Sequence, residues 1–255
     1  MIHSQAIVEK SAKIASDVEI GPWTYIGHDV EIDSGTVIGP HAVIKGPTKM
    51  GKNCRVFQFA SIGEDCMDKK YNGEPTRLEI GDNNIFRESC TIHRGTTQDE
   101  GVTRIGNDNL FMNFIHVAHD CVIGNNNVFA NGATLAGHCV VGNDVIMGGY
   151  SGAHQYCRLG NNSMASMGAM IVKDVPAFVL VSGDTAKAHG MNVEGMRRRN
   201  YPKETIDALR KAYRVVYRQG LTVKEAVAEL ESWPEIEQLN WFIDSVKNSN
   251  RGITR

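Results

Sequence analysis

The fold of this chain is decided by a short repeat, which is plainest in the stretch Ile14-Ala15-Ser16-Asp17-Val18-Glu19-Ile20-Gly21-Pro22-Trp23-Thr24-Tyr25-Ile26-Gly27. An apolar residue returns there at every sixth position, and the spacing holds for 26 units in three runs, over 2–62, 80–92 and 105–171. Neither an α-helix nor an ordinary sheet with turns has this period. A hexapeptide repeat is typical of a parallel β-helix, an all-β solenoid in which short strands stack coil upon coil.

Other positions of the hexad agree with a solenoid. Gly often follows the apolar residue, and a small or β-branched residue often stands four places after it. Because alternate residues of a strand point to the same side, we expect one large and one small side chain per strand to fill a narrow interior. Five of the six cysteines take this small inward position: Cys54, Cys90, Cys121, Cys139 and Cys157. Cys66 is off the pattern and no C-x-x-C occurs, so the cysteines predict core packing rather than a metal site or disulfides.

The bulk composition excludes several classes of protein. The chain has 255 residues and a net charge of −2, which gives no overall attraction to nucleic acid or to a membrane surface. The N-terminus enters the first hexad without a signal-peptide pattern, and no apolar run is long enough to span a bilayer. We therefore expect a cytoplasmic protein that inserts into no membrane and binds no nucleic acid.

The repeat is interrupted twice and then ends. Charged or polar residues occupy the would-be apolar positions Asp68, Glu74 and Gln98, which predicts excursions near 64–78 and 94–103. These are either functional loops or tolerated surface insertions. The solenoid is predicted to cover 1–175 and a helical domain 176–255, with helices near 202–219, 223–231 and 234–247. Thr222 with Glu225, and Ser232 with Glu235, fit the capping box that begins a helix.

Histidines gather in the second half of the repeat. The segment His116-Val117-Ala118-His119-Asp120 is open to three interpretations: metal ligands, an acid–base unit in which a carboxylate orients His119, or polar residues at an exposed corner. His119 and His138 are 19 residues apart, close to one coil of three hexads, so they should be near neighbours. Adjacent strand residues point in opposite directions, so Asp120 can serve His119 only across a corner.

A basic cluster stands in the C-terminal part: Arg197, Arg198, Arg199, Lys203, Arg210, Lys211, Arg214 and Arg218. Arg210, Arg214 and Arg218 share one helical face. The cluster is either a solvated face or a site for phosphate or an acidic protein.

Beyond the hexads, several motifs resemble those of the UDP-N-acetylglucosamine O-acyltransferases of lipid A biosynthesis. The motifs are Tyr71-Asn72-Gly73-Glu74-Pro75-Thr76-Arg77, Thr91-Ile92-His93-Arg94-Gly95-Thr96, Ala118-His119-Asp120-Cys121, Leu135-Ala136-Gly137-His138, Asn192-Val193-Glu194-Gly195-Met196-Arg197-Arg198-Arg199 and Arg251-Gly252-Ile253-Thr254-Arg255. The resemblance implies a left-handed parallel β-helix with a C-terminal helical domain and a homotrimer. It also implies transfer of an (R)-3-hydroxyacyl group from acyl carrier protein to the 3-hydroxyl of UDP-N-acetylglucosamine, without metal or cofactor.

The resemblance also implies roles for individual residues. His119 is expected to be the general base, Asp120 its orienting carboxylate, and the Gly137 amide the donor to the oxyanion. His138, His154 and Gln155 match residues near the sugar nucleotide, and Asp68 and Lys70 match residues that contact its sugar and phosphate region. Four further residues match the uridine and diphosphate side: Asn192, Glu194, Arg198 and Arg199. The basic cluster then suits the acidic acyl carrier protein.

One position, Met167, matches the residue against which the acyl chain ends and which is Gly in some members. A Met side chain fills space that a longer chain would need, so we expect an acyl chain of about ten or twelve carbons. The competing hypothesis from a different class is a zinc-dependent solenoid enzyme of the carbonic anhydrase type, using His116, His119 or His138.

Overall fold

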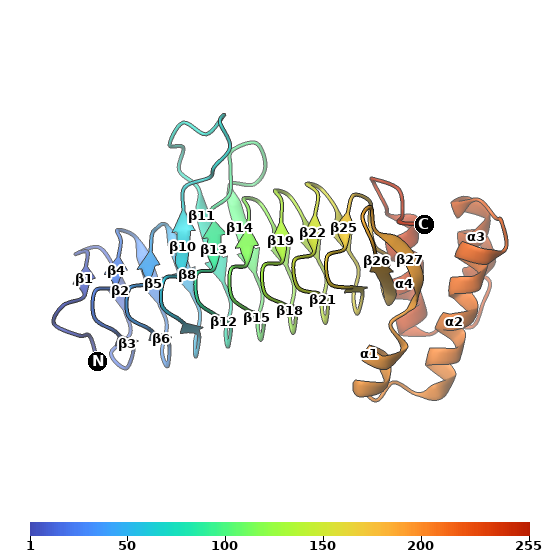
Figure 1. Cartoon of the computed structure of the whole chain (residues 1–255), viewed down its shortest axis with the longest axis horizontal. Coiled ribbons are helices and arrows are strands. Elements are labelled where there is room, and N and C mark those ends of the chain that lie inside the picture. The colour runs from blue at the N-terminus through green and yellow to red at the C-terminus, as the bar shows by residue number, and fades with distance from the viewer.

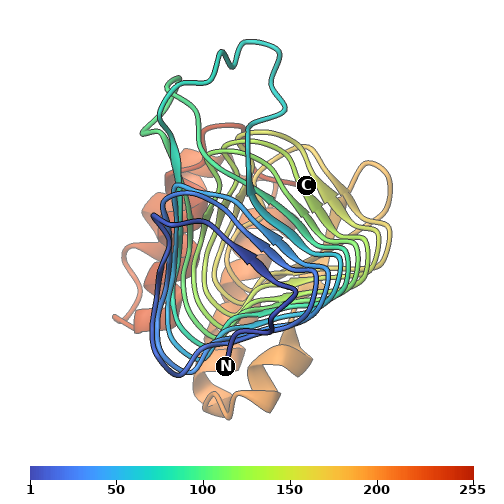
Figure 2. The same ribbon diagram turned by 90° about the vertical axis from the view of Figure 1, so that its left-hand side faces the viewer.

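The computed structural model describes residues 1–255, and most of the chain forms a triangular solenoid, seen from the side in Figure 1 and end-on in Figure 2. Each face of the prism is one sheet, and successive strands of a sheet come from successive coils. All strand pairs are parallel except the last, β26 with β27. Val117 pairs with Leu135, one coil of three hexads later, as the repeat predicts.

The nine-stranded sheet contains β1 (Ile7–Val8), β4 (Tyr25–Ile26), β7 (Val43–Ile44), β10 (Ser61–Glu64), β13 (Thr91–His93), β16 (His116–Val117), β19 (Thr134–Leu135), β22 (Gly152–Ala153) and β25 (Met170–Ile171). The eight-stranded sheet contains β2 (Lys13–Ile14), β5 (Val30–Ile32), β8 (Thr48–Met50), β11 (Arg77–Ile80), β14 (Val102–Ile105), β17 (Val122–Ile123), β20 (Val140–Val141) and β23 (Arg158–Leu159). The ten-stranded sheet contains β3 (Glu19–Ile20), β6 (Val37–Ile38), β9 (Arg55–Val56), β12 (Ile85–Phe86), β15 (Leu110–Phe111), β18 (Val128–Phe129), β21 (Ile146–Met147), β24 (Met164–Ala165), β26 (Val179–Ser182) and β27 (Lys187–Met191).

The interior of the prism is filled as the hexad predicts. The apolar hexad residues from Ile20 to Ile171 are buried, and all six cysteines are free and buried. Phe86, Phe111 and Phe129 stack in a column with ring centroids 4.9 and 4.8 Å apart. The first coil is an exception, because Ile2 and Val8 have no coil beneath them and remain partly open.

Four helices follow the last coil: α1 (Val193–Arg198), α2 (Lys203–Arg218), α3 (Val223–Leu230) and α4 (Glu237–Lys247). They lie at the C-terminal end of the prism (Figure 1), where Trp241 of α4 stacks on Phe178 and Ser245 accepts a hydrogen bond from the Ala177 N–H at 2.9 Å. None of the four has the length and apolar character that crossing a membrane requires. The division of the chain at residue 175 stays a prediction, since β26 still adds to the ten-stranded sheet beyond it.

The helical region confirms one predicted capping box and differs from the sequence prediction in two details. The Thr222–Glu225 capping box is present at the start of α3. The one predicted for Ser232 and Glu235 was wrong, because the Ser232 hydroxyl donates back to the Glu229 carbonyl oxygen and α4 begins only at Glu237. The short helix α1 was also not predicted.

The stacked column of phenylalanines gives the first testable prediction. Phe111→Ala should lower the free energy of unfolding by about 3–5 kcal/mol, because it leaves a void between two aromatic rings. Urea denaturation followed by circular dichroism measures this. The control Phe59→Ala removes an exposed ring and should cost about 0.5 kcal/mol or less. Equal losses in both variants would show that the column contributes no special stability.

Candidate active site

The predicted site residues of the second half of the repeat lie at one corner of the prism, between the nine-stranded and the eight-stranded sheet. We call it the histidine corner; it comprises residues 118–121, 136–139 and 154–157 of three successive coils. Both excursions open at the same corner of earlier coils. The first loop spans 65–76 between β10 and β11, and the second spans 94–101 between β13 and β14. The structure therefore places both loops beside the histidines.

His119 and Asp120 form a hydrogen-bonded pair across this corner. The His119 Nδ1–H donates to Asp120 Oδ2 at 2.8 Å, and the carboxylate is 1 % exposed. From the second loop, the Thr96 N–H donates to Oδ1 at 2.8 Å and the Thr96 hydroxyl to Oδ2 at 2.6 Å. Burial alone would raise the pKa of the Asp120 carboxyl, but the hydrogen bonds from His119 and Thr96 outweigh it and hold the pKa below its usual range. Asp120 is thus a fixed, ionised acceptor, and His119 has its Nε2 lone pair free.

Gly137, one coil further on, lies against the His119 ring. A Cβ atom at this position would come within 2.6 Å of His119 Cε1 and 2.7 Å of Nε2, so only glycine leaves room for the ring. The Gly137 N–H donates no hydrogen bond within the chain. A base nitrogen and an unused backbone donor therefore stand side by side.

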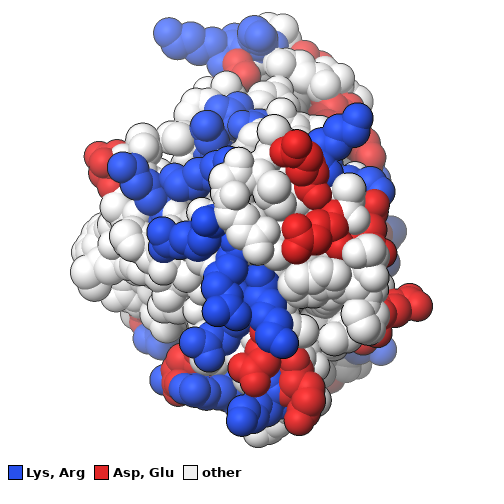
Figure 3. Space-filling view, turned by 90° about the vertical axis from the view of Figure 1, so that its right-hand side faces the viewer, with Lys and Arg blue, Asp and Glu red and all other residues white.

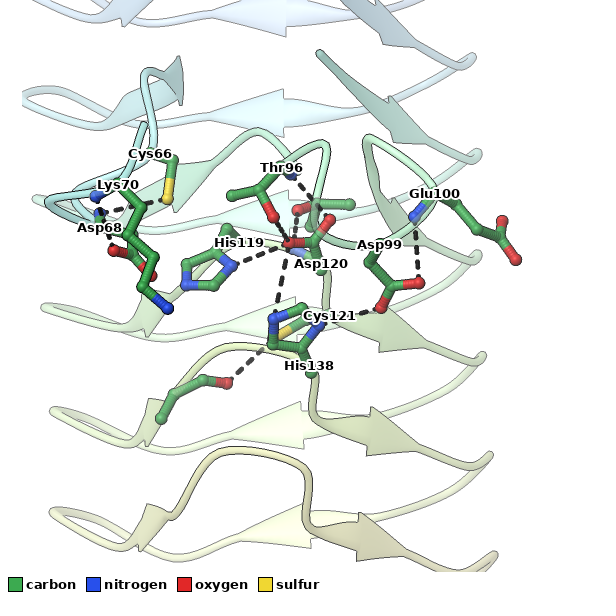
Figure 4. Close-up of polar contacts among 12 residues, drawn as sticks. Cys66, Asp68, Lys70, Thr96, Asp99, Glu100, His119, Asp120, Cys121 and His138 are labelled. Carbon is green, nitrogen blue, oxygen red and sulfur yellow. Dashed lines mark hydrogen bonds and ion pairs between the residues drawn. The ribbon is translucent and has the colours of Figure 1, made fainter. Parts of the chain in front are cut away.

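His138 completes the cluster, which Figure 4 shows with both loops. Its ring meets the His119 ring edge to face at 5.0 Å and stacks on Tyr156 at 4.5 Å. Its Nδ1 lies 2.9 Å from Asp99 Oδ2 of the second loop, and its Nε2 lies 3.8 Å from Asp120 Oδ2. The possible ligand atoms of His119, Asp120 and His138 lie within 4.8 Å of one another, so these three are the residues that could hold a metal ion by distance.

His116 stands apart from this cluster. It precedes the corner in β16, where its Nδ1 lies 2.8 Å from Thr91 Oγ1 and its ring meets His93 edge to face. Burial, and to a smaller extent the neighbouring His93 and His119, lower the pKa of His116 to about 4. His116 is therefore a neutral side chain at the edge of the site.

The first loop carries Asp68 and Lys70. The Asp68 carboxylate accepts a hydrogen bond from the Lys70 N–H at 2.9 Å, and the Cys66 sulfur accepts one from the Asp68 N–H at 3.2 Å. Burial raises the pKa of the Cys66 thiol, and the hydrogen bond from the Asp68 N–H opposes this effect. Figure 4 shows Asp68 and Lys70 beside the His119 ring.

Arg94, at the start of the second loop, ties the first loop to the solenoid. Its Nη1 donates to the carbonyl oxygens of Gly46 and Gly63, both at 2.7 Å, and its Nη2 contacts Tyr71 Oη and forms an ion pair with Asp65. The two loops are thereby one connected body over the corner.

His154 and Gln155 lie at the same corner, one coil beyond Gly137 and His138. Both are exposed, and His154 Nδ1 lies 3.1 Å from the Gln155 carbonyl oxygen.

The remaining predicted residues lie elsewhere in the chain. Helix α1 and its flanks lie beside the corner between the eight- and ten-stranded sheets. They carry Asn192, Glu194, Arg198 and Arg199. Asn192 caps α1 and donates to the Asn162 carbonyl oxygen, and Arg199 pairs with Asp144 at 3.0 Å. Arg198 is exposed and lies 3.4 Å from Glu194.

Met167 lies at the third corner, between the ten- and nine-stranded sheets, and is 76 % exposed. The strand rise puts the two corners of one face roughly 20 Å apart. Met167 also lies between two and three coils beyond His119 along the solenoid. One chain does not bring His119, α1 and Met167 together.

The basic cluster is largely exposed on the C-terminal face in Figure 3, where Lys and Arg side chains gather over the helices. Arg210, Lys211 and Arg214 line a groove of about 510 Å³ between α2 and the end of β27. On α1, Arg197 and Arg198 each pair with Glu194, at 3.9 and 3.4 Å.

Sequence analysis missed four residues that shape the site: Arg94, Thr96, Asp99 and Tyr156. The break in the repeat at Gln98 predicted the second loop, but it did not show which of its side chains contact the histidine corner. Tyr156 stands one coil beyond His138, and that spacing could have identified it.

Comparison with known proteins gives a consistent result over the full length. Residues 174–254 match the family described as UDP-N-acetylglucosamine O-acyltransferase, domain 2, and residues 11–46 and 103–137 match the bacterial transferase hexapeptide family. An acyl-(acyl-carrier-protein)–UDP-N-acetylglucosamine O-acyltransferase of Azotobacter vinelandii is 58 % identical, covering 100 % of this chain and 99 % of the relative.

Solved structures agree with these matches. LpxA from Acinetobacter baumannii superposes with a TM-score of 0.98 at 49 % identity, and the UDP-N-acetylglucosamine O-acyltransferase (LpxA) of Moraxella catarrhalis with 0.97 at 52 %. Each covers 100 % of this chain and 99 % of its own. The predicted fold class, a left-handed parallel β-helix with a C-terminal helical domain, is confirmed.

The contact between Gly137 and His119 gives a testable prediction. Gly137→Ala should push the His119 ring away from the corner and away from Asp120, because the added methyl group would overlap ring atoms. Any reaction that uses His119 should slow by about 10²-fold or more while the fold persists. Gly27→Ala is the control, since Gly27 follows β4 at the same corner, four coils before His119, and its nearest contact would be a looser 3.3 Å. Turnover in Gly137→Ala equal to that of the control would refute the tight packing of His119.

Proposed function

The chain belongs to the family of UDP-N-acetylglucosamine O-acyltransferases, and from this premise we propose that it transfers an (R)-3-hydroxyacyl group from acyl carrier protein to the 3-hydroxyl of UDP-N-acetylglucosamine, as the first step of lipid A biosynthesis. The observation that carries the proposal is the arrangement at the histidine corner. His119 Nε2 is unpaired and lies beside the unused N–H of Gly137, while Asp120 holds the opposite ring nitrogen.

The chemistry follows from that geometry. His119 Nε2 takes the proton of the sugar hydroxyl, and the oxygen attacks the thioester carbonyl carbon. The carbonyl oxygen becomes an oxyanion that the Gly137 N–H stabilises. When the intermediate collapses, the carbon–sulfur bond breaks and the carrier thiolate receives the proton from the His119 imidazolium. Asp120 stabilises that imidazolium and fixes the tautomer throughout.

The sugar nucleotide has candidate contacts on both sides of this centre. At the histidine corner, the proposed contacts to the sugar and phosphate region are Asp68, Lys70, His138, His154 and Gln155. We propose that Asn192, Glu194, Arg198 and Arg199 meet the uridine and diphosphate. Guanidinium groups suit a diphosphate because they donate paired hydrogen bonds. Arg198 is the most accessible of the three donors, since its side chain is 75 % exposed while Asn192 is buried and Arg199 is 26 % exposed.

We propose that the active molecule is a homotrimer. Two observations support this assembly. The predicted substrate residues occupy separate corners of the prism, so a complete site needs α1 or Met167 of a second copy against the histidine corner. In addition, Phe114, Tyr150 and Met167 form an exposed apolar column along one corner, at 67, 68 and 76 % exposure. Exposed apolar columns of this kind mark interfaces.

Acyl carrier protein is the proposed acyl donor. The groove lined by Arg210, Lys211 and Arg214 also contains Asp207, so its lining keeps an excess of positive charge that suits an acidic partner. The zinc-dependent alternative has no support among the relatives, whose names describe O-acyltransferases. The cytoplasmic location stays a prediction.

The function test uses His119→Ala. Turnover of UDP-N-acetylglucosamine with a hydroxyacyl carrier protein should fall by about 10²–10⁴-fold, as expected for loss of a general base, with the circular dichroism spectrum unchanged. Mass spectrometry of the product identifies the acyl group, and proton NMR identifies the esterified hydroxyl. Turnover within a few-fold of wild type in a folded variant would remove His119 from the mechanism. The absence of acyl transfer by the wild-type protein would refute the proposed reaction itself.

The trimer is tested by sedimentation equilibrium. The expected mass is three times that of one chain. Mixing His119→Ala chains with Arg198→Ala chains before refolding should give more turnover than either variant alone, because each site draws residues from two copies. A fully active monomer would contradict the shared site.

The acyl chain length is tested with Met167→Gly. We propose that Met167 of a neighbouring copy closes the end of the acyl channel, so that the native chain has about ten or twelve carbons. Each methylene that fits contributes roughly 0.8 kcal/mol, so opening the wall should shift preference toward fourteen carbons and weaken use of the native chain. The measurement is kcat/KM for ten-, twelve- and fourteen-carbon hydroxyacyl carriers in both proteins. An unchanged ranking would show that another residue sets the length.

A further inference from the structure

Asp99 makes a contact with the cluster that the proposed reaction does not yet use. It lies in the second loop, 39 residues before His138 in sequence, and its Oδ2 accepts a hydrogen bond from His138 Nδ1 at 2.9 Å (Figure 4). The His138 side chain is buried, whereas the Asp99 side chain is 48 % exposed. The contact therefore joins a half-exposed carboxylate to a buried ring.

The chain holds the Asp99 carboxylate in place from the other side. Its Oδ1 accepts a hydrogen bond from the Glu100 N–H at 3.0 Å, and Glu100 is itself paired with Arg104 at 2.6 Å. The Asp99 and Gly101 N–H groups both donate to the Thr96 carbonyl oxygen, which closes the loop into a tight turn. Oδ2 is thus the oxygen that remains for His138.

The His138 ring has two orientations that fit the same space, related by a half-turn about the Cβ–Cγ bond. Stacking on Tyr156 fixes the plane of the ring but does not distinguish these two orientations. Asp99 does distinguish them, because only one places a nitrogen rather than a carbon against its Oδ2. The same contact decides which ring nitrogen carries the proton, since a carboxylate accepts and does not donate.

We propose that Asp99 is a positioning residue that holds His138 with its proton on Nδ1 and its Nε2 directed toward the His119–Asp120 pair, where the sugar of the nucleotide is proposed to bind. The contact stands on the structure alone, while its consequence for substrate binding rests on the proposed function.

The second loop then orients both histidines of the site. Thr96 fixes Asp120, which fixes His119, and Asp99 fixes His138 directly. Thr96 and Asp99 belong to one turn of backbone, so a single loop contacts both sides of the cluster, whose two rings lie 5.0 Å apart on adjacent coils. The loop brings a donor, the Thr96 hydroxyl, to Asp120 and an acceptor, the Asp99 carboxylate, to His138. These contacts favour a functional loop over a surface insertion.

The kinetic test compares Asp99→Ala, Asp99→Asn and the control Gln98→Ala, which removes an exposed neighbour on the same loop. For Asp99→Ala we expect the KM for UDP-N-acetylglucosamine to rise roughly 10-fold to 100-fold, the equivalent of one charge-assisted hydrogen bond, with a smaller change in kcat. Asp99→Asn keeps an oxygen acceptor and should lie between wild type and alanine. Gln98→Ala should match wild type.

The spectroscopic test measures which nitrogen of the His138 ring carries the proton. In protein labelled with ¹⁵N-histidine, long-range ¹H–¹⁵N spectra distinguish a protonated Nδ1 from a bare one, and His138→Gln identifies the His138 signals. Wild type and Gln98→Ala should show protonated Nδ1, and Asp99→Ala should lose that signature. If the alanine variant does not fold, Asp99→Leu, which also has no acceptor, supplies the same comparison.

Two results would overturn the proposal: a His138 spectrum that is unchanged in Asp99→Ala, or a KM that moves no more than in Gln98→Ala. If the wild-type protein transferred no acyl group, the proposed function would fail, but the spectra would still decide whether Asp99 orients His138.

Discussion

Everything in this molecule depends on the register of one coil upon the next. Each strand contributes a large and a small inward side chain, and each of these packs on its equivalent one coil away, as in the Phe86–Phe111–Phe129 column. Inserting one residue inside a hexad would turn all later side chains of that face outward. Insertions are therefore confined to corners, and both long ones, 65–76 and 94–101, occur at the corner where the histidines stand.

The corner is also what makes the chemistry geometrically feasible. In a strand, His119 and Asp120 would point to opposite faces and could not bond. At the corner Asp120 adopts the left-handed region, φ 58°, as do His138 and Tyr156 in the next two coils. Such conformations cost on the order of 1 kcal/mol for residues other than glycine. The packed coils on either side impose them, so the rigidity of the solenoid holds the dyad in place.

The hexad spacing was enough to predict the sheets, the inward cysteines and the site of both loops, because each is a local consequence of a period. It also brought His119 and His138 together, since one coil separates them. The capping box at Thr222 followed from sequence, whereas that at Ser232 did not, because the Ser232 hydroxyl instead bonds back to the preceding turn. Thr96, Asp99 and Arg94 could not be predicted: their partners lie 24 to 48 residues away, across a loop with no period.

The same rigidity explains why one chain cannot hold its whole proposed site. A solenoid of packed coils has no hinge, so a prism cannot fold one corner onto another to close around a substrate. His119 stands at one corner, α1 beside the second and Met167 at the third, and these positions are fixed by the same register that builds the core. The proposed assembly of copies would bring corners face to face. The separate corners also keep two proposed roles apart. Met167, which is proposed to limit acyl length, lies at a different corner from His119. Its size can therefore change without disturbing the hydrogen bond between His119 and Asp120.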